Sequence, residues 1–191
     1  LLQLQTIGSV QISPDSDEVI YSVSTPRGAN EDPGGSHGQF FRASLMDNIP
    51  IPLFNTNIHV GSPQYSPDGK HIGFLYAEEG KARQVWVMET NGGTMKKLTN
   101  EAAGVSRFRW QPEERGIAYL SRSATSDREK ELKQRGYDFI FYEENLKNNY
   151  LHMAWFDDQW NQKSVWQLSH AGNTWDFEFN RQGTQIALTV S

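Results

Sequence analysis

The 191-residue sequence contains no cysteine, which excludes a disulfide framework and any metal site built on thiolates. No apolar run approaches the roughly 18–20 residues that a membrane-spanning helix needs, and residues 1–12 lack the basic start of a signal peptide. Positive charge is also scarce, because 18 Lys and Arg residues oppose 23 Asp and Glu residues, giving a net charge of −5. A basic nucleic-acid-binding surface is therefore not expected.

Aromatic residues make up 12% of the chain, a composition typical of a β-rich globular protein rather than a disordered one. Residues 62–99 resolve into four short apolar segments separated by three turns. The first turn, Ser66-Pro67-Asp68-Gly69, has a proline that presets φ, an aspartate that bonds back to the backbone, and a glycine that accepts positive φ. Asn91-Gly92-Gly93 supplies a hairpin turn before the last segment. This stretch predicts a four-stranded antiparallel meander.

The same template recurs on both sides of residues 62–99. A constant 13–14 residues separate the Leu that ends each fourth strand (Leu53, Leu98 and Leu168) from the next turn, whereas the interior of each unit varies in length. Constant connections with variable interiors are typical of radial repeats such as WD-like blades. The sequence therefore predicts an all-β fold, a β-propeller fragment of about three and a half four-stranded antiparallel blades. We expect one partial domain over residues 1–191, with its blades at about 9–54, 62–99 and 105–169 and a half-blade at 174–191.

The third blade carries an insertion, residues 121–149, between its second and third strands. Ser126-Asp127-Arg128-Glu129 is a capping-box pattern and Gly136 stands where a helix would stop, so the insertion predicts a short solvated helix. Residues 137–142 are apolar enough to form an extra strand. A loop at this position emerges on the same face of a propeller as the first blade's loop, residues 25–38.

Gly34-Gly35-Ser36-His37-Gly38 matches the G-x-S-x-G nucleophile elbow by letter. The elbow needs a strand before it and a helix after it, whereas here a loop precedes and a strand-like segment follows. We therefore expect no catalytic residue in this chain, and no effect of Ser36→Ala. The five histidines have neither the spacing nor the carboxylates of a metal site, so neither a metal nor a cofactor is expected. Five tryptophans fall on strands and are expected to act as wedges between blades: Trp86, Trp110, Trp155, Trp166 and Trp175.

Glu143 and Glu144 are adjacent carboxylates in the one insertion long enough to reach a ligand. Together they could hold a cationic group, such as the free amine of a peptide, by charge-assisted hydrogen bonds. The alternative is a solvated acidic turn. They are the only candidate substrate-binding residues that the sequence offers.

Several of these segments resemble the propeller of prolyl-oligopeptidase-family serine peptidases, especially the bacterial dipeptidyl peptidases and acylaminoacyl peptidases. The segments that carry the resemblance are residues 2–15, 19–21, 62–74, 84–88, 97–99, 137–139 and 149–152. TolB-like propellers share the turn motif and are the near relatives. In the peptidase family the propeller precedes a C-terminal α/β-hydrolase domain with a Ser-Asp-His triad, and filters access to it.

The resemblance implies an N-terminal propeller portion that gates or recognises peptide substrate for a hydrolase domain absent from these 191 residues. The chain alone would then be no enzyme, whereas its parent protein would be a serine peptidase of the dipeptidyl or acylaminoacyl type. The pair Glu143 and Glu144 is similar to the paired glutamates with which some dipeptidyl peptidases hold a substrate's amino terminus. The alternative is a TolB-like propeller acting as a non-enzymatic protein- or peptide-binding module.

The hypothesis of a peptidase propeller also predicts binding partners and a cellular location. The expected partners are the parent's C-terminal α/β-hydrolase domain and a peptide substrate, with self-association through open blade edges. No nucleic acid and no membrane span are expected. A periplasmic or secreted location is favoured over a cytoplasmic one.

Overall fold

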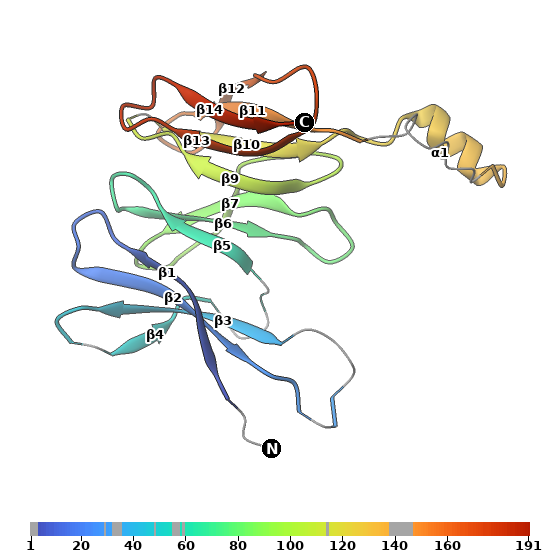
Figure 1. The fold of residues 1–191 in the computed structure, drawn as a ribbon. Coiled ribbons are helices and arrows are strands. Elements are labelled where there is room, and N and C mark those ends of the chain that lie inside the picture. The colour runs from blue at the N-terminus through green and yellow to red at the C-terminus, as the bar shows by residue number, and fades with distance from the viewer. Residues whose placement is uncertain are drawn as a thin grey trace. The chain divides into compact units, whose positions relative to one another are not determined.

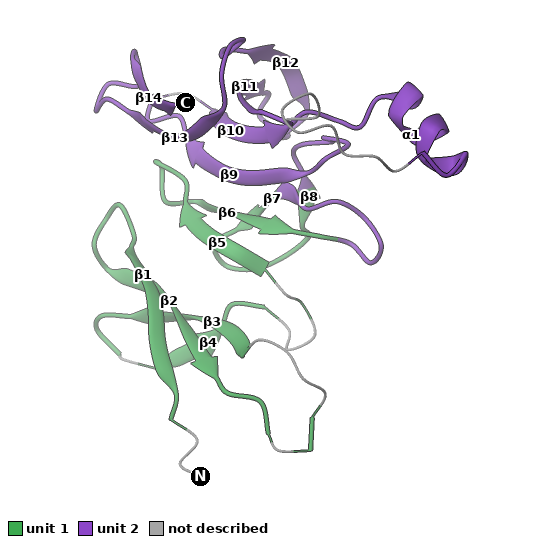
Figure 2. Cartoon of the chain, turned by 45° about the vertical axis from the view of Figure 1, so that its right-hand side comes forward, with its two compact units in different colours: residues 1–77, 86–96 green, residues 78–85, 97–191 purple. Residues whose placement is uncertain are grey.

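A computed structural model of the chain describes residues 4–28, 30–31, 36–47, 49–54, 58, 60–113, 115–137 and 147–191. The described residues form antiparallel β-sheets and one short helix (Figure 1). The chain divides into two compact units, residues 1–77 with 86–96 and residues 78–85 with 97–191 (Figure 2). The assignment of all 191 residues to one domain stays a prediction.

The first sheet lies in the first unit and has the strand order β1-β2-β3-β4. Its strands are β1 (Thr6–Ile12), β2 (Glu18–Thr25), β3 (His37–Ser44) and β4 (Pro50–Pro52). All three pairings are antiparallel. The Ser13 hydroxyl fixes the turn between β1 and β2, because it accepts the backbone N–H groups of Asp17 and Glu18 at 3.3 and 3.0 Å.

The second sheet has the order β5-β6-β7-β8 and contributes residues to both units. Its strands are β5 (Val60–Tyr65), β6 (His71–Tyr76), β7 (Gln84–Glu89) and β8 (Lys96–Lys97). The turn at Ser66 forms as the sequence predicts: Gly69 has a φ of +69° and its N–H donates to the Ser66 carbonyl at 2.9 Å. The predicted meander is therefore present as four hydrogen-bonded neighbours.

The core of the first unit consists of apolar side chains from neighbouring strands that point to the same side of their sheets. Its buried members are Ile20, Tyr65, Ile72, Phe74 and Met88. Each such side chain contributes roughly 1.5–3 kcal/mol when it leaves water, so this cluster supplies the main stabilisation of the unit.

The third sheet lies in the second unit, with the order β9-β10-β11-β12, beside a two-stranded sheet, β13-β14. The strands are β9 (Val105–Trp110), β10 (Gly116–Arg122), β11 (Asn149–Phe156), β12 (Gln162–Gln167), β13 (Thr174–Phe179) and β14 (Ile186–Val190). Phe177 of β13 packs into a buried cluster with Leu120 and Leu151. The expected fold class, four-stranded antiparallel blades of a β-propeller, is confirmed.

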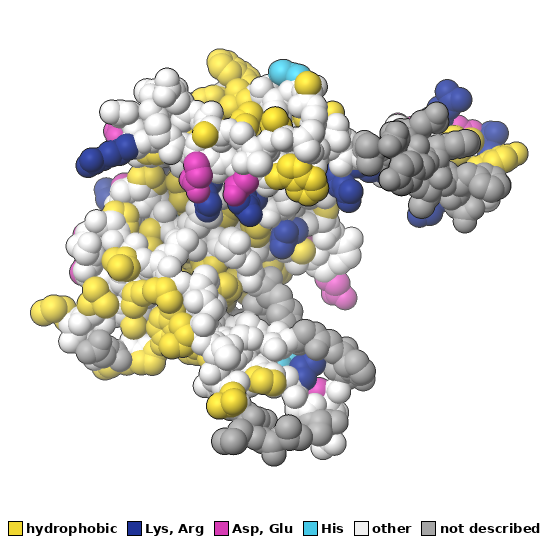
Figure 3. Space-filling view, viewed as in Figure 1, with side chains coloured by type: hydrophobic (Ala, Val, Ile, Leu, Met, Phe, Trp, Pro, Cys, Tyr) yellow, Lys and Arg dark blue, Asp and Glu magenta, His cyan; other side chains and the backbone are white. Residues whose placement is uncertain are grey.

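Ion pairs also join β9 to β13 within the second unit. Arg107 pairs with Asp176, and Arg109 Nη2 lies 2.8 Å from Glu178 Oε1. Figure 3 shows acidic and basic side chains gathered in this part of the surface. All four side chains are about one-third exposed or more, so each pair contributes little to stability. The two pairs link neighbouring sheets, since β9 and β13 belong to different sheets.

The predicted helix is confirmed as α1 (Asp127–Gln134). Ser126 is its N-cap and forms the full capping box with Glu129. At the other end Gly136 has a φ of +82°, and the Tyr137 N–H donates to the Leu132 carbonyl at 3.0 Å, which closes a Schellman motif. The extra strand expected at 137–142 falls largely on residues 138–146, which lie outside the described residues.

The tryptophans divide into two groups. Trp86 and Trp155 pack against the two core clusters and Trp110 is buried, as expected of wedges. Trp166 and Trp175 are 62% and 59% exposed, so the prediction is wrong at these two positions in this structure. They lie on β12 and β13, the outermost strand of the third sheet and the first strand of the two-stranded sheet. The one described helix, α1, is too short and too polar to cross a bilayer.

Candidate functional site

The predicted substrate-binding residues, Glu143 and Glu144, lie outside the described residues, so their role stays a prediction. The described ends of the insertion are fixed, however. Arg122 ends β10 and Asn149 begins β11, and the two residues are paired opposite one another. The insertion therefore leaves the third sheet at one defined edge.

A groove of about 470 Å³ lies at this edge, entirely within the second unit. Its lining residues come from the segment before β7, the loop into β9, and the insertion ends of β10 and β11. They are Arg83, Ala103, Gly104, Val105, Ser106, Arg122 and Asn149. We call this feature the insertion-edge groove. Two arginines are the only charged residues in its described lining.

Backbone carbonyl groups hold both guanidinium groups in place. Arg83 Nε donates to the Val105 carbonyl at 3.2 Å and its Nη2 donates to that of Ser106 at 3.5 Å. Arg122 Nε donates to the Lys147 carbonyl at 3.2 Å. Within the described part of the chain, neither guanidinium has a carboxylate within 4.0 Å. Both therefore keep N–H donors for a ligand.

Gly104 lets the loop approach the Arg83 backbone. Its φ is +80°, and a Cβ placed there would lie 2.9 Å from the Arg83 carbonyl oxygen. The next residue completes the contact, because the Val105 N–H donates to that same oxygen at 2.7 Å. This close approach brings the Arg83 side chain to the start of β9.

A network of hydrogen bonds holds the loop before β9, which forms part of the insertion-edge groove. Gln84 exchanges two hydrogen bonds with the Glu101 backbone, at 2.7 and 2.9 Å, and accepts another from the Thr99 hydroxyl at 2.8 Å. The Tyr119 hydroxyl donates to the Glu101 carboxylate at 2.7 Å. Ser121 donates to the Gly104 carbonyl at 3.0 Å. The groove-forming loop is therefore anchored on both sides.

Burial dominates the acid–base behaviour of this network. Burial first, and then the hydrogen bond to Glu101, raise the pKa of Tyr119 well above its ordinary value, so the phenol stays a donor at neutral pH. The His152 ring stacks on Tyr119 with centroids 5.2 Å apart. Burial lowers the pKa of His152, although the nearby Glu101 charge opposes this, so the imidazole is neutral near pH 7.

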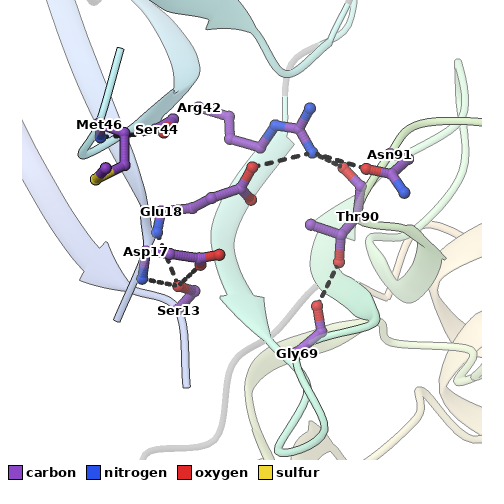
Figure 4. Close-up of polar contacts among 9 residues, drawn as sticks. All are labelled: Ser13, Asp17, Glu18, Arg42, Ser44, Met46, Gly69, Thr90 and Asn91. Atoms are coloured by element: carbon purple, nitrogen blue, oxygen red, sulfur yellow. Dashed lines mark hydrogen bonds and ion pairs between the residues drawn. The ribbon is translucent and has the colours of Figure 1, made fainter. Parts of the chain in front are cut away.

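A second groove, of about 430 Å³, lies in the first unit and has the opposite charge. Its lining residues are Ser13, Asp15, Asp17, Glu18, Gly69, Lys70, His71, Glu89, Thr90 and Asn91. Arg42 of β3 contacts two of these lining residues, with Nη1 2.6 Å from the Thr90 carbonyl oxygen and 3.7 Å from Glu18 Oε1 (Figure 4).

Asp15 and Asp17 of this second groove form hydrogen bonds within the turn between β1 and β2. The Ser13 hydroxyl donates to Asp17 at 3.0 Å, and the hydrogen bond from Ser13 is the main reason that the pKa of Asp15 is lowered. No group of three or more His, Asp or Glu side chains in the described ranges is arranged to hold a metal ion. These hydrogen bonds within the turn account for Asp15 and Asp17 without a ligand.

Ser36 does not lie in a nucleophile elbow. It is exposed and immediately precedes β3, so a strand rather than a helix follows it. The neighbouring His37 contacts Glu31, with His37 Nε2 2.8 Å from Glu31 Oε2, and among the described residues no hydrogen bond joins it to Ser36. The helix that follows the serine in an elbow is therefore replaced here by β3.

Sequence reasoning missed Arg83 and Arg122. They are 39 residues apart, and no spacing pattern relates them. The available signal was positional: Arg83 stands just before the third strand of one blade and Arg122 at the end of the second strand of the next. Both positions map to the edge from which blade insertions emerge.

No family model matches the chain. It is 34% identical over 146 residues to the uncharacterized peptidase YuxL of Bacillus subtilis, a match that covers 66% of this chain and 22% of that protein. It is 25% identical over 160 residues to dipeptidyl-peptidase 5 of Porphyromonas endodontalis, covering 84% of this chain and 22% of that protein. The chain thus spans about a fifth of the length of these curated relatives.

Solved propellers show the same fold. The acylaminoacyl peptidase of Pyrococcus horikoshii has a TM-score of 0.62 at 15% identity, over 90% of this chain and 26% of that one. The β-propeller domain of the Trilobed protease from Pyrococcus furiosus scores 0.55 at 15% identity, over 89% and 45%. TolB from Acinetobacter baumannii scores 0.60 at 17% identity, over 96% and 37%. At these identities the likeness establishes the fold alone.

The resemblance predicted from the sequence is confirmed. The curated relatives are peptidases, and the structural neighbours include an acylaminoacyl peptidase, a protease propeller and TolB.

Proposed function

We propose that this chain is the N-terminal propeller portion of a prolyl-oligopeptidase-family serine peptidase, where it recognises or gates peptide substrate for a hydrolase domain elsewhere in the protein. The observation that carries the proposal is the pair of curated peptidases, each matched over only 22% of its length. The strand that follows Ser36 in place of an elbow's helix supports the proposal. Peptide recognition would then belong to the propeller and peptide hydrolysis to another domain of the same protein.

The insertion-edge groove supports the recognition role. It lies where the 26 residues between Arg122 and Asn149 leave the third sheet, and peptide recognition in such a domain needs a surface groove with hydrogen-bond donors. Two anchored guanidinium groups provide those donors.

Peptide hydrolysis tests the proposal. We expect the native-length protein to hydrolyse chromogenic dipeptide or acyl-amino-acid substrates and to lose that activity on treatment with a fluorophosphonate. The 191-residue chain alone is expected to hydrolyse none of them. A native-length protein without any hydrolytic activity would contradict the proposal and favour the second candidate.

The second candidate is a TolB-like propeller that binds a protein or peptide without catalysing its hydrolysis. The structural likeness to TolB supports its fold, and the same assay separates the two roles. A native-length protein that binds peptide and hydrolyses none would support this candidate.

A further inference from the structure

We propose that Arg83 and Arg122 form a binding site for a carboxylate group of a peptide in the insertion-edge groove. This inference rests on the proposed function, because it names the chemistry by which the propeller recognises its peptide. Among the described residues, the two arginines are the only charged ones that line the groove, in a chain whose net charge is −5. The described lining of the groove therefore has the opposite sign to the net charge of the chain.

Both guanidinium groups are held in place before any ligand arrives. Arg83 is fixed by the carbonyl groups of Val105 and Ser106, and Arg122 by that of Lys147. These contacts use Nε of both side chains and Nη2 of Arg83, so Nη1 of Arg83 and both terminal amino groups of Arg122 remain without a partner among the described residues. A carboxylate binds such donors through charge-assisted, often bidentate hydrogen bonds, and less side-chain entropy is lost when the donors are already positioned.

Glu101, in the loop that leads into β9, does not compete for this site. The Glu101 carboxylate accepts the Tyr119 hydroxyl at 2.7 Å and lies 3.4 Å from the Ser121 hydroxyl, and it forms no ion pair with either arginine. The exposed Ala103 adds an apolar side chain to the lining, next to the exposed Ser106. An apolar surface beside the arginines suits a carboxylate carried by a peptide better than a strongly hydrated small anion.

A peptide carboxylate has two sources, the C-terminus and an Asp or Glu side chain. Three N-acetylated probes distinguish them: tetra-alanine with a free C-terminal acid, the same peptide as the C-terminal amide, and Ala-Ala-Glu-Ala as the amide. Acetylation removes the amine, so that Glu143 and Glu144 cannot contribute a charge interaction with it.

The experiment is an NMR titration of the ¹⁵N-labelled chain with each probe, repeated on Arg83→Gln and Arg122→Gln. It is run at a concentration at which sedimentation velocity shows the chain to be monomeric. Arg181→Gln is the matched control, since Arg181 is an exposed arginine of the same unit that lies in the turn between β13 and β14. Inorganic phosphate serves as a fourth probe. All the substituted side chains are exposed, so we expect each variant to keep the dispersed spectrum of the folded protein.

At least one acidic probe should bind about fivefold tighter than the amide and shift the amides of Gly104, Val105 and Ser106. Arg83→Gln and Arg122→Gln should each lose that preference, and Arg181→Gln should keep it. The identity of the tighter probe assigns the source of the carboxylate.

Equal affinity for the acid and amide probes would overturn the carboxylate site while leaving peptide recognition intact. A preference that survives both arginine substitutions would overturn it too. Phosphate binding the same amides as tightly as the acidic peptide would show a general anion site and refute the peptide assignment. Failure of every peptide to shift any amide would contradict both this inference and the proposed recognition role.

Discussion

Gly104 is the residue whose backbone conformation the insertion-edge groove depends on. With a φ of +80° and the Arg83 carbonyl oxygen 2.9 Å from the position of a Cβ, alanine would meet both backbone strain and a clash with backbone atoms. We expect Gly104→Ala to lower the free energy of unfolding by about 2 kcal/mol or more, since strain in the left-handed region alone costs roughly 1–2 kcal/mol. Urea denaturation followed by fluorescence measures the loss.

Gly80 is the matched control for this prediction. Its φ is +70°, but a Cβ at Gly80 meets nothing within 4 Å, so Gly80→Ala shows the conformational cost without the clash. Equal destabilisation by the two substitutions would show that the close approach to Arg83 contributes nothing.

His152 makes stability depend on pH. Its pKa is lowered in the folded state by burial, whereas in the unfolded chain it returns to about 6.5. As pH falls from 7 to 5, the unfolded state therefore takes up a proton before the folded state does, and the free energy of unfolding decreases. We expect wild type to lose more stability over this interval than His152→Phe, which keeps a ring against Tyr119.

The comparison needs urea denaturation curves at pH 5 and pH 7 for both proteins, because other groups titrate in the same range and cancel in the difference. His152→Gln, a smaller side chain, provides the same test if the larger phenyl ring disturbs the fold. An identical pH-dependent loss in wild type and both variants would refute the role of His152.

At the scale of elements, turns and caps were predictable from the sequence because their determinants are local. The Ser66 turn needs only Pro67, Asp68 and Gly69, and α1 needs only the Ser126–Glu129 pair and Gly136. The groove was not predictable, since it joins residues of two blades through backbone contacts that no spacing pattern records. Trp166 and Trp175 were misassigned for a related reason: a strand position does not show whether another element covers it.

Helix α1 is stabilised by its caps rather than by packing. It buries none of its residues, and the Ser126 hydroxyl accepts the Glu129 N–H at 3.2 Å. Ser126→Ala should cost the helix about 1 kcal/mol and reduce the helical ¹³Cα shifts of residues 127–134, with the sheets unaffected. Ser126→Asp retains a capping oxygen and should keep those shifts; unchanged shifts in Ser126→Ala would contradict the prediction.

At the scale of the whole molecule, the first sheet presents an uncovered apolar face. The register aligns Ile12 with Val19 and Val10 with Tyr21, and the exposed fractions of Ile7 and Ile12 are 70% and 62%. Figure 3 shows hydrophobic side chains at the surface of this sheet. Apolar area contributes roughly 25 cal/mol per Å² on burial, so a few hundred Å² favour association by several kcal/mol.

We therefore expect the isolated chain to self-associate as its concentration rises, and the double substitution Ile7→Thr with Ile12→Thr to weaken that association. Sedimentation velocity over a concentration series measures it. Ile49→Thr is the control, because Ile49 is equally exposed, at 65%, but lies outside the strands. A chain that stays monomeric at every concentration would contradict the expectation.

Fold and family likeness were both predictable from the sequence, because the blade template repeats and its turn chemistry is specific. The activity could not be predicted from these residues alone, because the proposed hydrolysis belongs to a part of the protein outside this chain. What the described residues do contain is a set of β-propeller blades with an arginine-lined groove, and a strand rather than a helix after Ser36.

The most direct measurement is to label the native-length protein with a fluorophosphonate and locate the adduct by peptide mass spectrometry. Our account predicts one modified serine, outside residues 1–191, and no labelling of the 191-residue chain alone. An adduct on Ser36, or on any other serine of this chain, would contradict it.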